Sequence, residues 1–282
     1  MSSLSPIINA SELLELCKKE ELILVDAGSG SEAKNNFLKN HLEGAVYIDL
    51  NDDLSNIKDN ASIGGRHPLP TPEQFSETLS QLGLCKTSHV VVYDMNRGAN
   101  AAARFWWMLK SIGHDLVQVL NGGQQAAEQI GFPMTSNIEE RPKSHYKITD
   151  WVLPIVEMDE VELASISEEY TIVDVRGENR YQGIEEPIDL IAGHIPNAIN
   201  IPYPENLDEN GKFKSPIELF KKYSELFNVY NAQNTIIHCG SGVTACHTIL
   251  AMDYAGMMVP KLYVGSWSEW SRNNKAMVLK ES

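Results

Sequence analysis

The residues best placed to do chemistry lie in one short segment, Thr235 to Cys246, with the sequence TIIHCGSGVTAC. An apolar, strand-like run ends at Cys239, a Gly-Ser-Gly loop follows, and the next apolar stretch has the pattern of a helix. A helix that begins after such a loop directs unpaired N–H groups and the positive end of its dipole toward the sulfur. A thiol placed there should lose its proton more easily, and the thiolate is the nucleophile. The sequence therefore predicts that Cys239 is a catalytic nucleophile.

A buried structural cysteine is the alternative for Cys239, since free cysteines are among the most buried residues. The loop Gly240-Ser241-Gly242 favours the reactive role, because a cysteine that only packs needs no flexible, anion-binding turn after it. Ser241 and Thr244 could donate hydroxyl hydrogen bonds into this loop, or they could simply cap the helix that follows.

The composition is that of an ordinary globular protein. The chain has 282 residues, of which 43% are hydrophobic and 22% charged, and this length suffices for two domains. A formal net charge of −15 without a cluster of Lys and Arg argues against nucleic acid or an anionic membrane as partner. No apolar run reaches the ~18–20 residues of a membrane span, and the first residues lack the pattern of a signal peptide. We therefore expect a cytoplasmic protein.

The four cysteines, Cys17, Cys85, Cys239 and Cys246, are too few for a disulfide framework. None belongs to a C-x-x-C pair, and no His or Cys residues accompany them at zinc spacing, so we expect free thiols in a reducing compartment. We expect neither a metal nor an organic cofactor. Cys17 and Cys85 are interpreted as packing residues, and Cys246 as a structural residue of the first helical turn.

The two halves of the chain repeat the same order of segments. The matching pairs are 22–27 with 170–176, 41–48 with 193–201, 72–79 with 216–223, 90–94 with 235–239, and 117–123 with 261–266. Short β-branched strands that alternate with helices predict a parallel sheet with helices on both faces. We predict an α/β protein of two tandem domains, residues 1–135 and 153–282, joined by a polar linker over 136–152.

The repeat places Asp94 where the second half has Cys239. Both residues follow a predicted strand, and ligands of open parallel sheets bind beyond the carboxyl ends of the strands. Because Asp94 offers no thiol, we predict a catalytic second half and a degenerate first half.

These motifs resemble those of the two-domain rhodanese-like sulfurtransferases over about residues 7–270. The motifs are the strand end Val-Asp-x-Arg at 173–176, GHIPNA at 193–198, the Cys239 loop, and GSWSEW at 265–270. The loop text CGSGVTA is similar to that of the 3-mercaptopyruvate sulfurtransferases, whereas the thiosulfate-using branch usually has basic residues directly after the cysteine. The resemblance implies two tandem rhodanese-like domains.

The resemblance also implies the reaction. A small anionic donor, 3-mercaptopyruvate, would pass its sulfur to Cys239 as a persulfide and leave as pyruvate, and a thiol or cyanide would accept the sulfur. The acceptor thiol would be thioredoxin or a low-molecular-weight thiol. The loop N–H groups would stabilise the thiolate and the persulfide, as an oxyanion hole does for oxygen. These groups belong to Gly240, Ser241, Gly242, Val243 and Thr244.

Two further residues gain roles from the resemblance. Arg180 matches an arginine that binds the substrate carboxylate, for which a planar guanidinium is suited; the alternative is a surface ion pair with Glu178 or Glu185. His67 matches a histidine of the site, and with Ser241 it could form a relay that polarises the ketone or moves a proton. The alternative for His67 is a structural hydrogen bond in a loop.

A second substrate arginine is expected after a Glu-Pro pair, but Ile188 occupies that position. Arg180 could hold the carboxylate alone, or Arg66 or Arg97 of the first half could contribute a second cation.

Three other functions compete with this interpretation. Thiosulfate could be the donor, or the protein could be a persulfide carrier without turnover of its own. The protein phosphatases related to the rhodanese fold need an arginine that closes the loop on phosphate. The residues after Thr244 are Ala245, Cys246 and His247, so that arginine is absent.

Overall fold

The computed structural model describes residues 4–227 and 231–279, and its contacts divide the chain into two units. The first unit consists of Met1–Asn56, Pro70–Val152 and Glu209–Phe213. The second unit consists of Ile57–Leu69, Leu153–Asp208 and Lys214–Ser282. A short segment of each half therefore belongs to the unit of the other half. The domain limits 1–135 and 153–282 stay a prediction.

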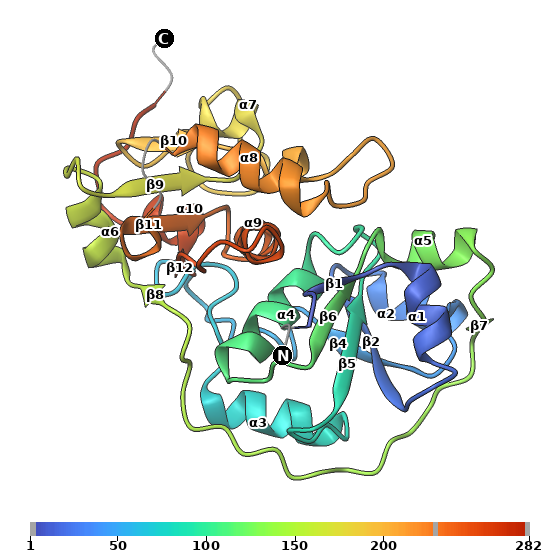
Figure 1. The fold of residues 1–282 in the computed structure, drawn as a ribbon. Coiled ribbons are helices and arrows are strands. Elements are labelled where there is room, and N and C mark those ends of the chain that lie inside the picture. The colour runs from blue at the N-terminus through green and yellow to red at the C-terminus, as the bar shows by residue number, and fades with distance from the viewer. Residues whose placement is uncertain (1–3, 228–230, 280–282) are drawn as a thin grey trace. The chain divides into compact units, whose positions relative to one another are not determined.

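A five-stranded parallel sheet with the order β1-β6-β5-β2-β4 is the centre of the first unit (Figure 1). Val25 of β2 pairs with Val92 of β5 and with Val46 of β4, so apolar side chains follow one another across the sheet. The strands are β1 (Ile7–Ile8), β2 (Leu22–Gly28), β4 (Ala45–Asp49), β5 (His89–Tyr93) and β6 (Val117–Leu120). An antiparallel pair completes the unit: β3 (His41–Leu42) and β7 (Met134–Thr135).

The helices of the first unit connect these strands. Thr71 caps α3 by accepting the N–H of Gln74, and Pro72 occupies the first turn, as the sequence predicts. Helix α4 is buried on nearly every side, which explains its almost continuous apolar sequence. The helices are α1 (Ala10–Leu16), α2 (Ala33–Lys39), α3 (Pro72–Gln81), α4 (Ala101–Ser111) and α5 (Gly123–Gln129).

The second unit has a parallel sheet with the order β10-β9-β11-β12-β8. Each strand takes the place of its counterpart in the first sheet, so the predicted duplication is confirmed at the level of topology. The α/β fold class with helix-flanked parallel sheets is confirmed as well. The strands are β8 (Ile155–Val156), β9 (Thr171–Asp174), β10 (Ala198–Asn200), β11 (Thr235–His238) and β12 (Lys261–Tyr263).

The helices of the second unit repeat the pattern of the first. Ser215 caps α8 in a capping box with Glu218, just as Thr71 caps α3. The α-helices are α6 (Met158–Ala164), α7 (Glu178–Tyr181), α8 (Pro216–Leu226), α9 (Thr244–Tyr254) and α10 (Ser266–Trp270). Two 3₁₀ turns accompany them: η1 (Tyr203–Asn206) and η2 (Ala232–Asn234). Trp267 and Trp270 of α10 are fully buried in the core, where they pack with Ile172 and Ile236 of the sheet.

Between β7 and β8 the chain has neither helix nor strand, in agreement with its polar composition. Part of it nevertheless packs on the first unit. Tyr146 is buried, and its N–H donates to Ser80 Oγ at 3.0 Å. The ring of Trp151 lies 5.4 Å from that of Phe75. The predicted linker is therefore held along α3 over much of its length.

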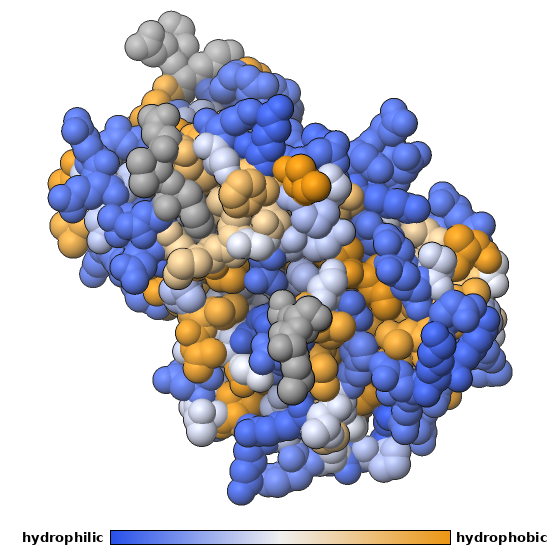
Figure 2. All heavy atoms as spheres, viewed as in Figure 1, coloured by the Kyte–Doolittle hydropathy of each residue, from blue (hydrophilic) through white to orange (hydrophobic). Residues whose placement is uncertain are grey.

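Hydrophilic side chains cover much of the face in Figure 2, with smaller hydrophobic areas between them. Among residues 4–227 and 231–279, no helix has the length and hydrophobicity that crossing a membrane requires.

Cys17 and Cys85 are exposed, so their interpretation as packing residues was wrong. Two hydroxyls, those of Ser88 and Thr87, lie 3.3 Å from the Cys85 sulfur and lower the pKa of the thiol to about 7.

The buried carboxyl of Asp26 in β2 should make stability depend on pH. Burial raises its pKa to about 7, against a hydrogen bond from Tyr93 that lowers it. The folded state therefore holds an extra proton between about pH 4 and pH 7, and stability is lost as the pH rises through this window. Asp26→Asn should unfold at a higher temperature than the wild type at pH 8, with a smaller difference at pH 5. Thermal unfolding at both values checks this, and exposed Asp59→Asn should show no such pH-dependent gain.

Candidate functional site

Cys239 follows β11 directly and is held on both sides by the start of α10. Its N–H donates to Ser266 Oγ at 3.1 Å, and its carbonyl accepts the N–H of Trp267 at 3.0 Å. The residue is 2% exposed. Ser266 is fully buried and has φ = 54°, a conformation that non-glycine residues rarely adopt. The strand, loop and helix around the cysteine are those that the sequence predicts.

The loop after Cys239 leaves a row of backbone donors without acceptors. Gly242 has φ = 72°, and a Cβ placed on it would lie 2.5 Å from the carbonyl oxygen of Val264, so no larger residue fits there. Helix α9 begins at the end of the loop, where the first N–H groups of a helix have no partner within it. Within the described chain, four N–H groups here donate to no other group: those of Gly240, Ser241, Val243 and Thr244.

The corresponding loop of the first unit already surrounds a buried side-chain carboxyl. Asp94 follows β5 as Cys239 follows β11, and its side chain is almost fully buried. Its carboxylate accepts four backbone hydrogen bonds at 2.7–3.2 Å, from the N–H groups of Asn96, Gly98, Asn100 and Ala102. A loop at this position of the fold can thus surround an anion with main-chain donors.

His67 and Ser241 lie together, although 174 positions separate them in the sequence. His67 Nδ1 is 2.8 Å from Ser241 Oγ. His67 belongs to the segment Ile57–Leu69, which the contacts assign to the second unit. The structure therefore brings together the two residues that the sequence analysis paired, while their catalytic role stays a prediction.

The segment that carries His67 is fixed to the chain around α10. A Cβ on Gly65, which has φ = 77°, would clash with the carbonyl oxygen of Gly265, so the two backbones touch. Three hydrogen bonds hold the segment: Gly64 N–H to Glu269 Oε1 at 2.6 Å, Arg66 N–H to Ser268 Oγ at 3.0 Å, and Asn273 Nδ2 to the Ser62 carbonyl at 3.0 Å. These contacts hold the backbone that carries His67 beside α10.

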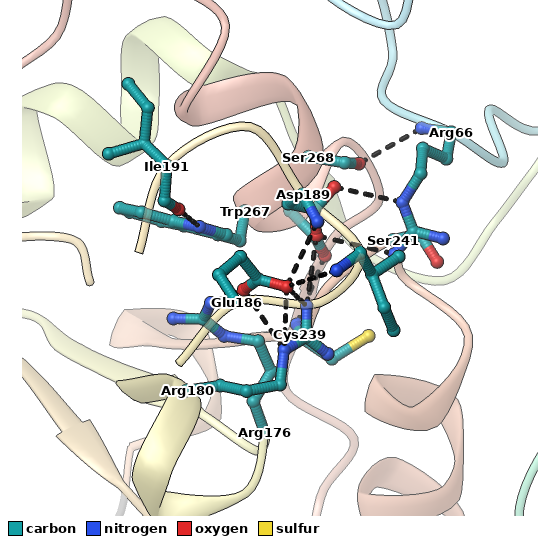
Figure 3. A network of polar contacts seen from close by, with 12 residues as sticks. Arg66, Arg176, Arg180, Glu186, Asp189, Ile191, Cys239, Ser241, Trp267 and Ser268 are labelled. Carbon is teal, nitrogen blue, oxygen red and sulfur yellow. Dashed lines mark hydrogen bonds and ion pairs between the residues drawn. The ribbon is translucent and has the colours of Figure 1, made fainter. Parts of the chain in front are cut away.

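Arg180 of α7 is bound by two buried carboxylates (Figure 3). Its Nη2 lies 2.7 Å from Glu186 Oε1 and 3.1 Å from Asp189 Oδ2. Its partners are therefore Glu186 and Asp189, and not the surface residues Glu178 or Glu185. A Cβ placed on Gly240 would lie 3.4 Å from Nη2 and 3.5 Å from Nη1 of Arg180. The guanidinium thus lies against the residue that follows the predicted nucleophile.

The other sequence candidates for a second substrate cation lie in different places. Arg66 pairs with Asp189 in the second unit. Arg97 belongs to the first unit, where its side chain packs against Gly211. Ile188 is 53% exposed and brings no charge to the cluster.

Arg176 braces the end of β9. It binds Asp174 and the carbonyl of Gly193, and its guanidinium lies 4.8 Å from the centre of the Trp267 ring. Burial alone would raise the pKa of Asp174, but its ion pair and hydrogen bonds with the Arg176 guanidinium hold it below its ordinary value. Burial would also raise the pKa of Glu186, but the Arg180 guanidinium and the N–H groups of Asp189 and Ile188 together hold it below its ordinary value. Both carboxyls therefore stay ionised.

His238 is the last residue of β11 and directly precedes the cysteine. It is fully buried 3.8 Å from Asp174, and burial lowers its pKa, so the ring is neutral at pH 7.

The sequence analysis missed the acidic partners of Arg180. Glu186 and Asp189 follow it within one short segment, and a fixed guanidinium needs such carboxylates nearby. The acidic residues shortly after Arg180 were therefore the sequence signal that could have identified its partners.

No group of three or more His, Cys, Asp or Glu side chains suited to a metal ion occurs in residues 4–227 and 231–279.

The rhodanese-like domain matches the chain twice, over residues 9–129 and 157–273. The chain belongs to the rhodanese-like domain family. Each match contains four of the five strands of one parallel sheet, all except β1 in the first and β8 in the second. The family predicted from the sequence is confirmed.

Three known proteins illustrate the similarity. The chain is 35% identical to the probable 3-mercaptopyruvate sulfurtransferase of Pseudomonas aeruginosa over 276 residues, which is 96% of either chain. It is 35% identical to the thiosulfate sulfurtransferase of Bos taurus over 243 residues, covering 85% of this chain and 80% of the bovine protein. The structure of 3-mercaptopyruvate sulfurtransferase from Leishmania major superimposes with a TM-score of 0.82 at 29% identity, over 94% of this chain and 74% of the other.

Removing the Asp94 carboxylate should destabilise the first unit. In Asp94→Ala, the N–H groups that the carboxylate binds would lose their acceptor, and each buried donor left unpaired costs about 1–3 kcal/mol. We expect a loss of at least about 3 kcal/mol in the free energy of unfolding. Asp94→Asn keeps one carbonyl oxygen and should lose less. Urea denaturation of both variants checks the order, and equal stabilities of Asp94→Ala and the wild type would contradict it.

Proposed function

We propose that the protein is a 3-mercaptopyruvate sulfurtransferase that works through a persulfide on Cys239. The observation that supports this most directly is the loop of unpaired N–H groups around the cysteine, with the Arg180 guanidinium against Gly240. A donor bound there would have its sulfur at the thiolate and its carboxylate at the arginine. The similarity to the Pseudomonas and Leishmania proteins points to the same donor.

The first half-reaction transfers sulfur to the enzyme. The Cys239 thiolate attacks the donor sulfur, an S–S bond forms, and the C–S bond breaks with its electron pair moving to the carbon. The organic product leaves as the enolate of pyruvate, which takes up a proton to give pyruvate. Charge that develops on the ketone oxygen needs a hydrogen-bond donor. We propose the Ser241 hydroxyl for this role, and its distance of 2.8 Å from His67 Nδ1 supports the proposal.

The second half-reaction returns the cysteine to its thiolate. A thiol or cyanide attacks the outer sulfur of the persulfide, the S–S bond breaks, and its electron pair goes to Cys239. The loop N–H groups of residues 240–244 would stabilise negative charge on sulfur in both halves of this ping-pong cycle. We propose thioredoxin or a low-molecular-weight thiol as acceptor, and a cytoplasmic location.

Thiosulfate is the second candidate donor, because the chain is also 35% identical to the bovine thiosulfate sulfurtransferase, although over 243 residues and not the 276 of the Pseudomonas match. Thiosulfate is a dianion and gains from point charges beside the sulfur. Gly240 and Ser241 follow the cysteine here, and neither is basic. We therefore favour the monocarboxylate donor.

Cys239→Ser should abolish turnover and leave the fold intact, because a hydroxyl cannot form the persulfide. Pyruvate release from 3-mercaptopyruvate measures the turnover, and thermal unfolding confirms the fold. In the wild type without acceptor, mass spectrometry should find one added sulfur on the peptide that contains Cys239. Cys246→Ser is the matched control and should retain the modified peptide. Pyruvate release by folded Cys239→Ser would refute the mechanism, and wild type that never releases pyruvate would indicate a carrier.

Ser241→Ala should slow turnover of 3-mercaptopyruvate more than turnover of thiosulfate. Loss of the hydroxyl removes a donor to the ketone oxygen, so kcat for 3-mercaptopyruvate should fall by about 100-fold or more. Thiosulfate has no ketone and should be affected less. Initial rates with both donors, for wild type and variant, test this. An equal fall with both donors would assign Ser241 to the loop structure instead of to the ketone.

A further inference from the structure

A cavity of about 300 Å³ lies at the carboxyl ends of β2 and β5 in the first unit. The two strands are neighbours in their sheet (Figure 1), and from them the chain runs outward in opposite directions, from β2 to β4 and from β5 to β6. Ligands of open parallel sheets bind at such a reversal of strand order. In the second unit the reversal lies between β9 and β11, and Cys239 follows β11. The cavity therefore has the place in the first unit that the nucleophile has in the second.

The lining of the cavity is acidic. Asp26 and Glu32 belong to it, and none of the described lining residues is Lys, Arg or His. Two carboxyls that line one cavity without a cation repel an anion and attract a positive charge. The main-chain donors of the adjacent loop offer no anion site either, because Asp94 accepts them. The cavity thus favours the opposite charge to the one that the Cys239 loop would stabilise.

The carboxyl of Asp26 can accept further hydrogen bonds. Asp26 is 5% exposed, and in the part of the chain that the structure describes its one hydrogen bond comes from the Tyr93 hydroxyl. A carboxylate has about four acceptor positions. Its oxygens are not among the enclosed polar atoms that lack a partner, so the carboxyl is open to the cavity that it lines. A cation bound there would supply the counter-charge that this buried group lacks.

Gln124 adds a second acceptor to the lining. It is 4% exposed, and its Nε2 donates to Glu128 Oε1 at 2.9 Å, which fixes the orientation of the amide. Within residues 4–227 and 231–279, Oε1 of Gln124 accepts no hydrogen bond, and it is not an enclosed atom. A ligand with several N–H groups can therefore donate to Asp26 and Gln124 together.

Phe37 and Met95 contribute apolar surface to the same cavity. Phe37 is 4% exposed and packs in the core of the first unit, whereas Met95 is 45% exposed. Sites for small molecules combine an apolar lining with a few polar groups that fix the orientation of the ligand. A thioether also packs favourably against an aromatic ring. The lining thus suits a ligand with a positive end and an apolar end.

We propose that the first unit has a binding site for a small organic cation, an ammonium group carried on an apolar group, between the loops that follow β2 and β5. The ammonium donates to the Asp26 carboxyl and to Gln124 Oε1, and the apolar group lies against Phe37 and Met95. This site is independent of the proposed function, since none of its residues takes part in sulfur transfer. The half without a thiol is then a ligand-binding unit with an inverted preference for charge.

NMR of methionine methyl groups tests the site at pH 8, where the Asp26 carboxyl is ionised. Benzylammonium is the probe, benzyl alcohol is its uncharged counterpart, and benzoate carries the opposite charge. Met95→Leu assigns the Met95 signal, which should shift in a saturable way with benzylammonium. The signal of Met258, 71% exposed in the second unit, should not shift. Benzyl alcohol should bind about tenfold or more weakly, because it lacks the charge-assisted hydrogen bond.

Two substitutions test the acceptors. Asp26→Asn keeps the shape of the side chain and removes its charge, so the Kd of benzylammonium should rise about tenfold or more. Gln124→Met removes a neutral acceptor and should raise the Kd by a smaller factor, about threefold. Asp115→Asn is the matched control, since it also removes one negative charge from the first unit. Its side chain is 81% exposed and does not line the cavity, so its Kd should equal that of the wild type.

Every result decides for or against the site. A saturable shift of Met95 that Asp26→Asn weakens and Asp115→Asn leaves unchanged would support it. A wild-type Met95 signal that benzylammonium does not move, or that benzoate moves equally, would overturn it. An equal Kd for folded Asp26→Asn and wild type, or a parallel shift of Met258, would do the same. The melting temperature of each variant establishes that it is folded, and Asp26→Asn should melt no lower than the wild type at this pH.

Discussion

The geometry of the site depends on one buried negative charge, that of Asp189. Removing a carboxylate from water costs several kcal/mol unless cations and hydrogen bonds compensate it. Here the compensation comes from residues 66, 180 and 272, which no local sequence pattern connects. Because the carboxylate cannot move without losing all three, it fixes the segments that carry them. The guanidiniums that face the nucleophile loop are therefore held in place before any substrate arrives, which lowers the cost of binding.

The loops after β5 and β11 differ in what accepts their backbone N–H groups. A loop between a parallel strand and a helix directs several N–H groups to one point, and these groups need an acceptor. In the first unit Asp94 supplies a permanent one from its own side chain. In the second unit the corresponding residue is Cys239, and the N–H groups of Gly240, Ser241, Val243 and Thr244 donate to no other group in the described part of the chain. The first loop is saturated and structural, while the second can bind charge that appears during a reaction.

Local features of the fold could be predicted from the sequence, and long-range ones could not. The repeated strand pattern predicts both sheets, because β-branched runs that alternate with helices leave few other arrangements. The loop of Cys239 and the capped starts of α3 and α8 follow from neighbouring residues alone. Asp189 resembles any other acidic residue in the sequence, since its three partners are brought to it only by folding. The positive φ of Ser266 has the same origin, because packing around it overrides the ordinary preference of serine.

The half without a thiol supplies a short segment that forms part of the second unit. Ile57–Leu69 comes from the first half of the sequence, yet it belongs to the second unit and carries both Arg66 and His67. Glu209–Phe213 does the reverse: in the first unit, the N–H of Phe213 donates to Asn121 Oδ1 at 2.8 Å. A chain that began at Leu153 would have the cysteine and Arg180. It would lack His67, the partner of Ser241, and Arg66, which pairs with Asp189. Asp189 would then keep its buried charge with fewer cations around it, which is the costly arrangement. The duplication therefore produced two units that each depend on a segment of the other half, and not two independent copies.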